Sequence, residues 1–379
     1  MTASVSTVWD VAIVGAGPAG SATARRLAQR GCHVLLIEGS RFDESRVGES
    51  LAPAVKPLLQ ALGVWPAFMQ LEPVPSYGTR SLWGRDLPED HSHLMTPYEC
   101  GWHVERHRFD RMLAQSAVDA GAALHLGARV TGCETTTAGF ELRLTDGCSR
   151  EDRGAVQVRF VVDATGRRTA LARFMRARHK TFDRLIGVGT EFEDCTADAH
   201  RYTLVETSPL GWWYAAPLTH RRSMVMLMGD ADLLQRSGVM QEHGWQTELS
   251  ATTLLRERVG SAHARRAVRS FCAVSQRLMR DPAGASNWLA VGDAALAVDP
   301  ISGSGVIRAL RTAEAASSAI VETLSGNSNA IPTYEHARNR ECTEYLFERV
   351  GYYDLEHRWQ TTFWHRRRAA AENALALVG

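Results

Sequence analysis

The sequence predicts an α/β protein with a βαβ unit at the N-terminus, a second sheet of antiparallel strands and a helical C-terminus. Residues 11–38 place a glycine-rich turn between two apolar runs, residues 181–230 alternate strand-like stretches with turn residues, and the chain is helical in pattern from about residue 331. Short, closely spaced strands favour an antiparallel sheet, whereas strands joined through helices favour a parallel one. With 379 residues, two or more domains are expected.

The N-terminal unit has the sequence VAIVGAGPAGSATARRLAQRGCHVLLIE. Residues 11–14 form an apolar run too short for a helix and predict a buried strand. A helix is expected over about residues 21–30, with Gly31 in the C-cap position, and a second strand over residues 33–37. Glu38 ends this strand, where its carboxylate can accept hydrogen bonds from a ribose hydroxyl.

The turn of this unit has the pattern GxGxxG. Gly15 permits the tight turn, Gly17 lets a pyrophosphate approach the backbone, and Gly20 lets the helix pack on the strand. The N-terminal amides and the dipole of the helix face the phosphates. The complete strand, turn, helix and strand with the acid in place therefore predict dinucleotide binding.

Residues 46–53, RVGESLAP, allow two interpretations. Gly48 suits a turn, and Glu49 or Ser50 can open a helix that runs to about Leu62. Alternatively, the segment is a loop beside the cofactor, with Arg46 and Glu49 near it. The residues alone do not decide between these two interpretations.

Composition disfavours several classes of protein. The formal net charge of +1 disfavours a nucleic-acid partner. No apolar run reaches the roughly 20 residues that span a bilayer, and the N-terminus lacks a signal-peptide pattern, so a cytoplasmic protein without membrane contact is expected. The seven scattered cysteines indicate reduced thiols. His91, His93 and His103 match no ligand spacing, so no metal is expected.

The middle of the chain continues the α/β pattern. An amphipathic helix is expected over residues 104–121, and Arg106 at its start opposes the helix dipole, which indicates an anion nearby. Residues 158–166 contain a buried strand that ends in Asp163. Further strands are expected at residues 124–126, 128–133 and 140–144, and in the second sheet at residues 186–192, 202–206, 212–217 and 223–228. Residues 232–264 look helical.

The last third returns to the opening pattern. A strand at residues 288–291 precedes a turn at Gly292 and Asp293, and a loop of small residues leads into a helix over about residues 306–323. Exposed amides in this loop suit a planar ring lying against the backbone. Aromatic residues recur in the helical C-terminus, where helix packing is the favoured interpretation, and the basic run at residues 365–368 predicts a solvated face.

Three segments, GAGPAG with Glu38, VVDATG at residues 161–166 and the stretch 292–305, together resemble the FAD-dependent monooxygenases built like aromatic hydroxylases. RVGES narrows the resemblance to the branch of the flavin-dependent halogenases and their relatives. The resemblance implies a Rossmann-like FAD-binding domain made of residues 1–75, 101–180 and 276–325, an antiparallel-sheet substrate domain of residues 76–100 and 181–275, and a C-terminal helical region, 326–379.

The same resemblance implies non-covalent FAD and a set of contacts to it. Arg106 would meet its phosphate or adenosine side, and Gly303 and Gly305 would lie beside the isoalloxazine. Asp163 is either a cofactor contact or a support for the adenine side. The implied contacts are Gly15, Ala16, Gly17, Pro18, Ala19, Gly20, Glu38, Arg46, Glu49, Ser50, Arg106, Val130, Asp163, Gly292, Asp293, Pro300, Gly303, Ser304 and Gly305.

Two features depart from the halogenase pattern. The WxWxIP segment of those enzymes is replaced by WWYAAP at residues 212–217. They also need a lysine about 30 residues past the GE motif, where this chain has Gly78, and its only lysines, Lys56 and Lys180, stand elsewhere. Hypohalous acid would have no ammonium to hold it, so halogenation is not expected.

A smaller group resembles the chain more closely: flavoproteins that hydroxylate tryptophan during assembly of tryptophan-derived quinone cofactors, and related peptide-modifying enzymes. RVGESLAP, GWHVERHRFDRML at 101–113, GWWYAAPL at 211–218 and the tail at 352–367 carry this resemblance. It implies a monooxygenase that uses O2 and electrons from NAD(P)H, directly or through a flavin reductase, on a tryptophan-containing peptide or protein.

No catalytic side chain is assigned, since indole carbons are nucleophilic enough to need no obvious strong base. The candidates for the substrate pocket are Trp102, His103, Trp212, Trp213 and Tyr214, and core packing explains these residues equally well. The tail around residues 359–364 is a candidate border of the pocket mouth. Alternative functions are a hydroxylase or halogenase of a small aromatic natural product, an isoprenoid-type flavin reductase, or a non-catalytic assembly flavoprotein.

Overall fold

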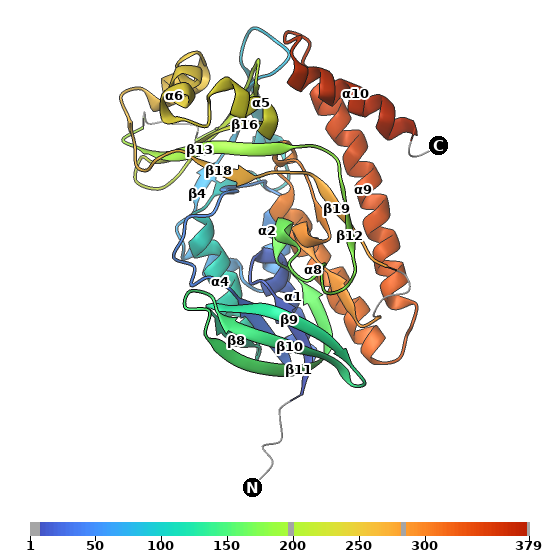
Figure 1. The fold of residues 1–379 in the computed structure, drawn as a ribbon. Coiled ribbons are helices and arrows are strands. Elements are labelled where there is room, and N and C mark those ends of the chain that lie inside the picture. The colour runs from blue at the N-terminus through green and yellow to red at the C-terminus, as the bar shows by residue number, and fades with distance from the viewer. Residues whose placement is uncertain (1–7, 196–200, 282–285, 377–379) are drawn as a thin grey trace.

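The computed structural model describes residues 8–195, 201–281 and 286–376. It has the predicted α/β fold, with a mixed sheet at one end of the molecule, a second sheet at the other end, and long C-terminal helices along the side (Figure 1). None of the helices within the described residues is long and apolar enough to cross a bilayer.

The first sheet has the strand order β8-β2-β1-β11-β10-β9, with β20 beside β11. Its parallel strands are β1 (Trp9–Val14), β2 (Val34–Glu38), β8 (Ala123–Leu126), β20 (Trp288–Ala290) and the end of β11 (Asp152–Asp163), and its antiparallel strands are β9 (Ala128–Thr136) and β10 (Gly139–Asp146). One face packs its apolar residues against α1 (Pro18–Gln29), α4 (Arg106–Asp119) and α8 (Gly305–Leu324). The carboxyl ends of β1 and β2 therefore meet the start of α1.

The second sheet has the order β17-β13-β16-β15-β14-β5-β6, with β18 beside β13. Its pairs are antiparallel except β14 with β5. The strands are β5 (Gly78–Leu82), β6 (Glu89–Ser92), β13 (Leu185–Glu193), β14 (Thr203–Ser208), β15 (Gly211–Pro217), β16 (Ser223–Asp230), β17 (His263–Ala264) and β18 (Arg269–Cys272). Two small sheets link the parts: β3 (Ser50–Leu51), β4 (Val74–Ser76) and β7 (Gly101–His103), and β12 (Arg178–Thr181), β19 (Gln276–Met279) and β21 (Leu296–Ala297).

The two faces of the second sheet have different neighbours. Trp213 packs on one face with Trp245, against the short helices α5 (Ala231–Ser237), α6 (Glu242–Ser250) and α7 (Leu254–Val259). Trp212 and Tyr214 lie in the cluster on the opposite face, because successive side chains of a strand alternate. The three aromatic residues of WWYAAP therefore do not line one wall, which corrects the expected pocket.

Of the two interpretations of RVGES, the one in which it opens the helix is not found, since Ser50 lies in β3, which pairs with β7, and α2 (Val55–Ala61) begins five residues later, followed by α3 (Trp65–Met69). The expectation for the basic run 365–368 is wrong. This run is not a solvated face, because Arg367 is 4% exposed and donates to Asp230 at 2.7 Å.

The C-terminal region consists of α9 (Ala330–Asp354) and α10 (Thr362–Ala376), and α9 runs alongside both ends of the molecule (Figure 1). Phe363 and Trp364 are fully buried against Tyr353 and the second sheet. These aromatic residues pack helix on sheet, as the favoured interpretation of the aromatic pattern predicted. The tail from 359 to 364 is absent from the lining of the large cavity described below.

Candidate active site

The glycines of GAGPAG differ in the space around them. Gly15 has a φ of +107°, and a Cβ on it would stand 2.3 Å from the Ala164 carbonyl oxygen. A Cβ on Gly20 would stand 1.9 Å from the carbonyl oxygen of Gly15, so both positions are closed by the protein itself. A Cβ on Gly17 would meet nothing within 4 Å. The backbone at Gly17, the N-cap of α1, is thus open to an anionic ligand.

Glu38 ends β2 within a network of charges. Its carboxylate accepts from the amide of Ala16 at 2.8 Å and from Arg46 at 2.9 Å, and Arg46 also reaches Asp110 at 2.9 Å. Burial alone would raise the pKa of Glu38, but Arg46 and the hydrogen bonds outweigh it and hold the pKa below its ordinary value. Arg106 completes the network through Asp110 at 3.1 Å. Glu38 is therefore ionised and fixed beside the glycine turn.

The anion expected near Arg106 is thus an internal one, Asp110, which is 1% exposed and was missed in the sequence. Its position four residues after Arg106 on the same helix is the signal that would have found it. Arg106 also donates to the carbonyl of Val47 at 2.9 Å, which ties α4 to the RVGES loop.

Asp163 is fully buried and holds the turn that follows β11. Its carboxylate accepts from the amide and hydroxyl of Thr165 at 3.0 and 2.7 Å and from the amide of Leu171 at 3.0 Å. Burial raises the pKa of Asp163. These contacts favour the supporting role over direct cofactor contact. Val130, on β9, also belongs to a hydrophobic core cluster of the first sheet, and it is 9% exposed.

The 292–305 segment places open backbone at the start of α8. Gly303 has a φ of +58°, and a Cβ on Gly303 or Gly305 would meet nothing within 4 Å. Pro300 begins a short turn in which Asp299 accepts from the Ile301 amide at 3.1 Å. The hydroxyl of Ser304 lies 2.8 Å from that of Ser302. These residues leave room for a planar ring against the main chain.

The first part of this segment packs against its neighbours more closely. Gly292 has a φ of +56°, and a Cβ on it would lie 2.7 Å from the Cβ of Ala19 in α1. Asp293 pairs with Arg167 at 3.3 Å. Gly292 therefore lets the turn after β20 approach α1, and Asp293 is the next residue in this turn.

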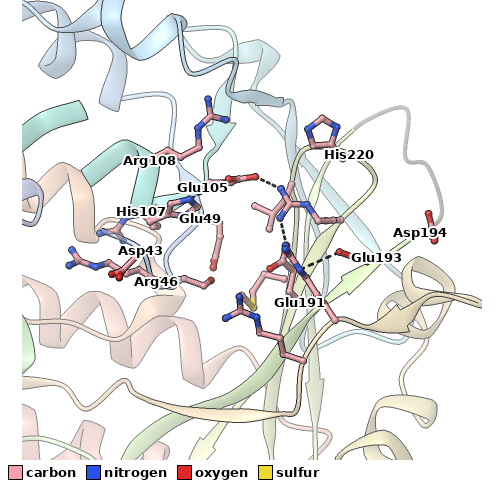
Figure 2. A pocket seen from close by; sticks show the side chains of 17 residues that line it. Asp43, Arg46, Glu49, Glu105, His107, Arg108, Glu191, Glu193, Asp194 and His220 are labelled. Atoms are coloured by element: carbon pink, nitrogen blue, oxygen red, sulfur yellow. Dashed lines mark hydrogen bonds and ion pairs between the residues drawn. The ribbon is translucent and has the colours of Figure 1, made fainter. Parts of the chain in front are cut away.

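A cavity of about 690 Å³ opens beside the RVGES loop (Figure 2). Its walls come from this loop, the start of α4, β13 and the β15–β16 hairpin. Arg222 forms ion pairs with Glu105 and Glu191 across two of these walls. Exposed side chains form the rim, among them Arg108, His220, Arg265 and Arg266. The cavity is charged and reachable from the surface.

Glu49 is the unusual member of the cavity lining, and Figure 2 shows it between Arg46 and Glu191. It is 2% exposed, and its Oε1 has no hydrogen-bond partner among the described residues. Its Oε2 accepts from the Gly48 amide at 3.0 Å and from the Tyr214 hydroxyl at 3.4 Å. Burial raises the pKa of Glu49 to about 7. A carboxyl with this pKa can both accept and donate a proton near neutral pH.

The pocket candidates separate around Glu49. Tyr214 and His103 both contact Ser50, at 3.0 Å each, so they stand next to the RVGES loop. Trp102 packs in a hydrophobic cluster with Trp65 and is 4% exposed. None of the five predicted pocket residues is among those that line the cavity. Of the five candidates, only Tyr214 and His103 are thus linked to Glu49.

Comparison with known proteins identifies the family of this chain. The model of the FAD binding domain family matches residues 8–346, and the chain belongs to this family. A putative FAD-dependent oxidoreductase, LodB of Marinomonas mediterranea, is 26% identical over 365 residues, which are 95% of this chain and 97% of that protein. A tryptophan 2-halogenase of Chondromyces crocatus is 26% identical over 96% of this chain and 71% of its own length.

Solved structures share the fold. The chondrochloren halogenase CndH, of myxobacterial origin, superimposes with a TM-score of 0.87 at 24% identity, covering 98% of this chain and 89% of that one. The peptidyl tryptophan dihydroxylase QhpG superimposes with a TM-score of 0.75 at 24% identity, covering 96% and 79%. The protein is an FAD-dependent enzyme of the halogenase and aromatic hydroxylase type of fold.

FAD fits the residues described above. Gly17 leaves the start of α1 open to a pyrophosphate, Glu38 stands beside it at the end of β2, and Gly303 and Gly305 leave backbone open to the flavin ring. Bound FAD supplies the redox chemistry by which O2 reacts with an organic substrate, and the protein orients and shields the reactants. Within the RVGES loop, Arg46 pairs with Glu38, and Glu49 lines the cavity.

Proposed function

We propose that this protein is an FAD-dependent monooxygenase that hydroxylates a tryptophan side chain carried by a peptide or protein. The observation that carries the proposal is the cavity beside the RVGES loop, which contains an unpaired buried carboxyl, Glu49, and no lysine in its lining. The FAD is held without a covalent bond, and O2 and electrons from NAD(P)H or a flavin reductase complete the reaction.

The positions of the lysines support hydroxylation over halogenation. Lys56 lies over the ring of Trp65 on α3, and Lys180 lies near Phe182 beside β12. At the place where a halogenase-type lysine was sought, a Cβ on Gly78 would stand 2.5 Å from the His91 carbonyl oxygen, so no longer side chain fits. An ammonium group to hold hypohalous acid is therefore missing from the cavity.

One structural relative supports a macromolecular substrate. QhpG is described as a peptidyl tryptophan dihydroxylase essential for tryptophylquinone cofactor biogenesis. The exposed rim of the cavity, with His220 and Arg265, allows an indole to enter while its backbone remains outside. The charged walls suit a polypeptide better than a free apolar aromatic compound.

The test supplies FAD, O2 and NAD(P)H with a flavin reductase to the purified protein. Free tryptophan, tryptophan-containing peptides and the product of a neighbouring gene are offered separately, each with chloride and bromide present. We expect mass gains of oxygen atoms on the peptide or protein only. Efficient oxidation of free tryptophan would refute the proposed peptide or protein substrate. A chlorinated or brominated product would establish the halogenase alternative.

A matched pair of variants distinguishes an FAD-dependent enzyme from a non-catalytic assembly protein. Gly17→Val introduces a side chain into open space at a negative φ, so the protein should fold but lose FAD and all oxidation. Gly351→Val, also in open space but on α9, should retain both. Product formation by the flavin-free variant would identify a non-catalytic assembly role. Flavin that stays with the acid-precipitated wild-type protein would overturn non-covalent binding.

A further inference from the structure

A row of hydrogen bonds leads from Glu49 into the protein. The Tyr214 hydroxyl lies 3.4 Å from Glu49 Oε2 and 3.0 Å from Ser50 Oγ. Ser50 Oγ lies 3.0 Å from His103 Nδ1, and His103 Nε2 lies 3.0 Å from the carbonyl oxygen of Arg201. Four elements supply these groups: the RVGES loop with β3, β7, β15 and the segment before β14. We call this row the Glu49 chain.

The chemistry of each group fixes the direction of the chain. The Arg201 carbonyl can only accept, so His103 carries its proton on Nε2 and presents Nδ1 as an acceptor to Ser50. Ser50 then donates to His103 and accepts from Tyr214. When Glu49 is protonated, it can donate to Tyr214, and every donor in the chain points from the cavity toward His103. When Glu49 is ionised, Tyr214 can donate to it instead.

The two ends of the chain have different access to solvent. Glu49 lines the cavity and has a buried oxygen without a partner among the described residues, while His103 is 1% exposed and contacts the main-chain carbonyl of Arg201. Ser50 has a side contact, the hydroxyl of Thr203 at 3.2 Å. The Glu49 chain therefore leads from the cavity into the protein and ends at a buried histidine and a main-chain carbonyl.

We propose that Glu49 accepts the proton that the substrate ring releases during hydroxylation, and that Tyr214 and Ser50 can pass this proton on to Nδ1 of His103. The inference rests on the proposed function. It makes Glu49 the catalytic base, and makes Tyr214, Ser50 and His103 the positioning residues that hold it and can take up its proton.

The step balances. The ring carbon gains one oxygen atom of O2, the other oxygen atom leaves as water, and the nicotinamide or reduced flavin provides two electrons. The ring carbon then carries both hydrogen and oxygen; its C–H bond breaks, the electron pair restores the aromatic ring, and the proton goes to Glu49 Oε1. Because the formation of water consumes one proton, the proton on Glu49 replaces one taken from solvent.

Several titratable or charged groups surround Glu49 or its hydrogen-bonded row. They are Arg46 on its own loop, Arg106 on α4, Tyr214 on β15, Glu191 on β13, Arg222 just before β16 and His103 on β7. Arg106 and the hydrogen bonds from Gly48 and Tyr214 favour the ionised carboxylate, and burial opposes them more strongly. The burial that leaves Oε1 unpaired thus also keeps Glu49 able to take a proton near neutral pH.

Infrared spectroscopy tests the chain without requiring turnover. Wild-type protein, with and without FAD, should show a buried carboxylic-acid band that disappears with a midpoint near pH 7 and is missing in Glu49→Gln. After mixing with D2O the band should shift, and Ser50→Ala, which removes a partner of both Tyr214 and His103, should change the midpoint of the band. Glu191→Gln, which removes another carboxyl of the cavity, should leave the band in place. A titrating band that persists in Glu49→Gln, or an unchanged midpoint in Ser50→Ala, would overturn the proposal.

Turnover provides the second test. With a substrate deuterated at the reacting ring carbon, Glu49→Gln should lower turnover by about 100-fold or more and reveal an isotope effect that the wild type lacks. Glu49→Asp should restore part of the rate. Full turnover in Glu49→Gln without an isotope effect would refute the role of Glu49. A wild type that hydroxylates no substrate refutes the proposed function instead, while the infrared results still report on the chain.

Discussion

Two buried carboxyl groups, those of Asp299 and Glu49, differ in how they are paired. Asp299 is fully buried, and its oxygens accept from the Tyr353 hydroxyl at 2.7 Å and the Ile301 amide at 3.1 Å, with Arg349 at 3.8 Å. Glu49 is 2% exposed, but its Oε1 has no partner among the described residues. Burial raises the pKa of both groups.

The difference indicates different tasks. The partners of Asp299 come from α9 and from the loop that begins at Pro300. This carboxyl therefore holds that loop against α9. Only one oxygen of Glu49 is paired, and this residue lines a space that a ligand can enter. A buried polar atom without a partner is costly, so its presence beside a cavity favours a chemical role over a structural one.

The largest expected effect comes from breaking the paired site. Asp299→Ala leaves Tyr353 and Arg349 facing an empty position, and we expect the free energy of unfolding to fall by about 3–5 kcal/mol. Denaturant titration measures it. The control Asp86→Ala removes a side chain that is 95% exposed and should change stability by less than about 0.5 kcal/mol. A loss below 1 kcal/mol for Asp299→Ala would contradict its structural assignment.

Replacing Glu49 should raise the free energy of unfolding at high pH, whereas replacing Asp299 lowers it. The pKa of Glu49 rises from the ordinary 4.5 to about 7 on folding, so the native state binds the proton more tightly. Stability therefore falls as pH rises through this interval, and the deficit persists above it. Glu49→Gln should stabilise the flavin-free protein at pH 8 by up to ~3 kcal/mol and leave it unchanged at pH 4. An equal effect at both pH values would exclude titration as the cause.

A smaller effect is expected from one hydroxyl of the paired site. Tyr353→Phe removes the donor to Asp299 and the acceptor for the Trp212 indole N–H at 3.0 Å, and should lower stability by about 1–2 kcal/mol. Tyr352→Phe is the matched control, since Tyr352 is 45% exposed. Thermal unfolding followed by circular dichroism compares the two variants. Equal melting temperatures would mean that the buried hydroxyl contributes nothing.

The smallest effect should come from a charged pair outside both sites. Arg159 and Asp10 form a 2.9 Å ion pair with side chains 49% and 30% exposed. Arg159→Ala should lower the free energy of unfolding by less than about 1 kcal/mol, because solvent and salt screen exposed charges. Repeating the titration in high salt should remove what difference remains. A loss as large as that of Asp299→Ala would show that burial does not explain the ranking.

The sequence itself determined the βαβ unit and its nucleotide-binding turn. The constraints there are local: Gly15 needs a positive φ, Gly20 must let the helix approach the strand, and Glu38 is the last residue of β2. The short strands of the second sheet were also predicted, because their alternation and turn residues are local signals. The sequence left open whether RVGES opens a helix or forms a loop beside the cofactor, because the pairing of β3 with β7 joins residues about fifty positions apart.

Only the tertiary structure decided which side chains surround Glu49. Ser50 meets His103 across 53 positions and Tyr214 across 164, so neither contact is visible in a local pattern. The register of β15 sends Trp212 and Tyr214 to one face and Trp213 to the other. Burial of Glu49 raises its pKa, and burial depends on elements from four parts of the chain. The sequence predicts the cofactor because the glycine turn that is expected to bind it lies in one continuous segment. The candidate base is recognised only in the folded structure, because its neighbours come from strands far apart in the sequence.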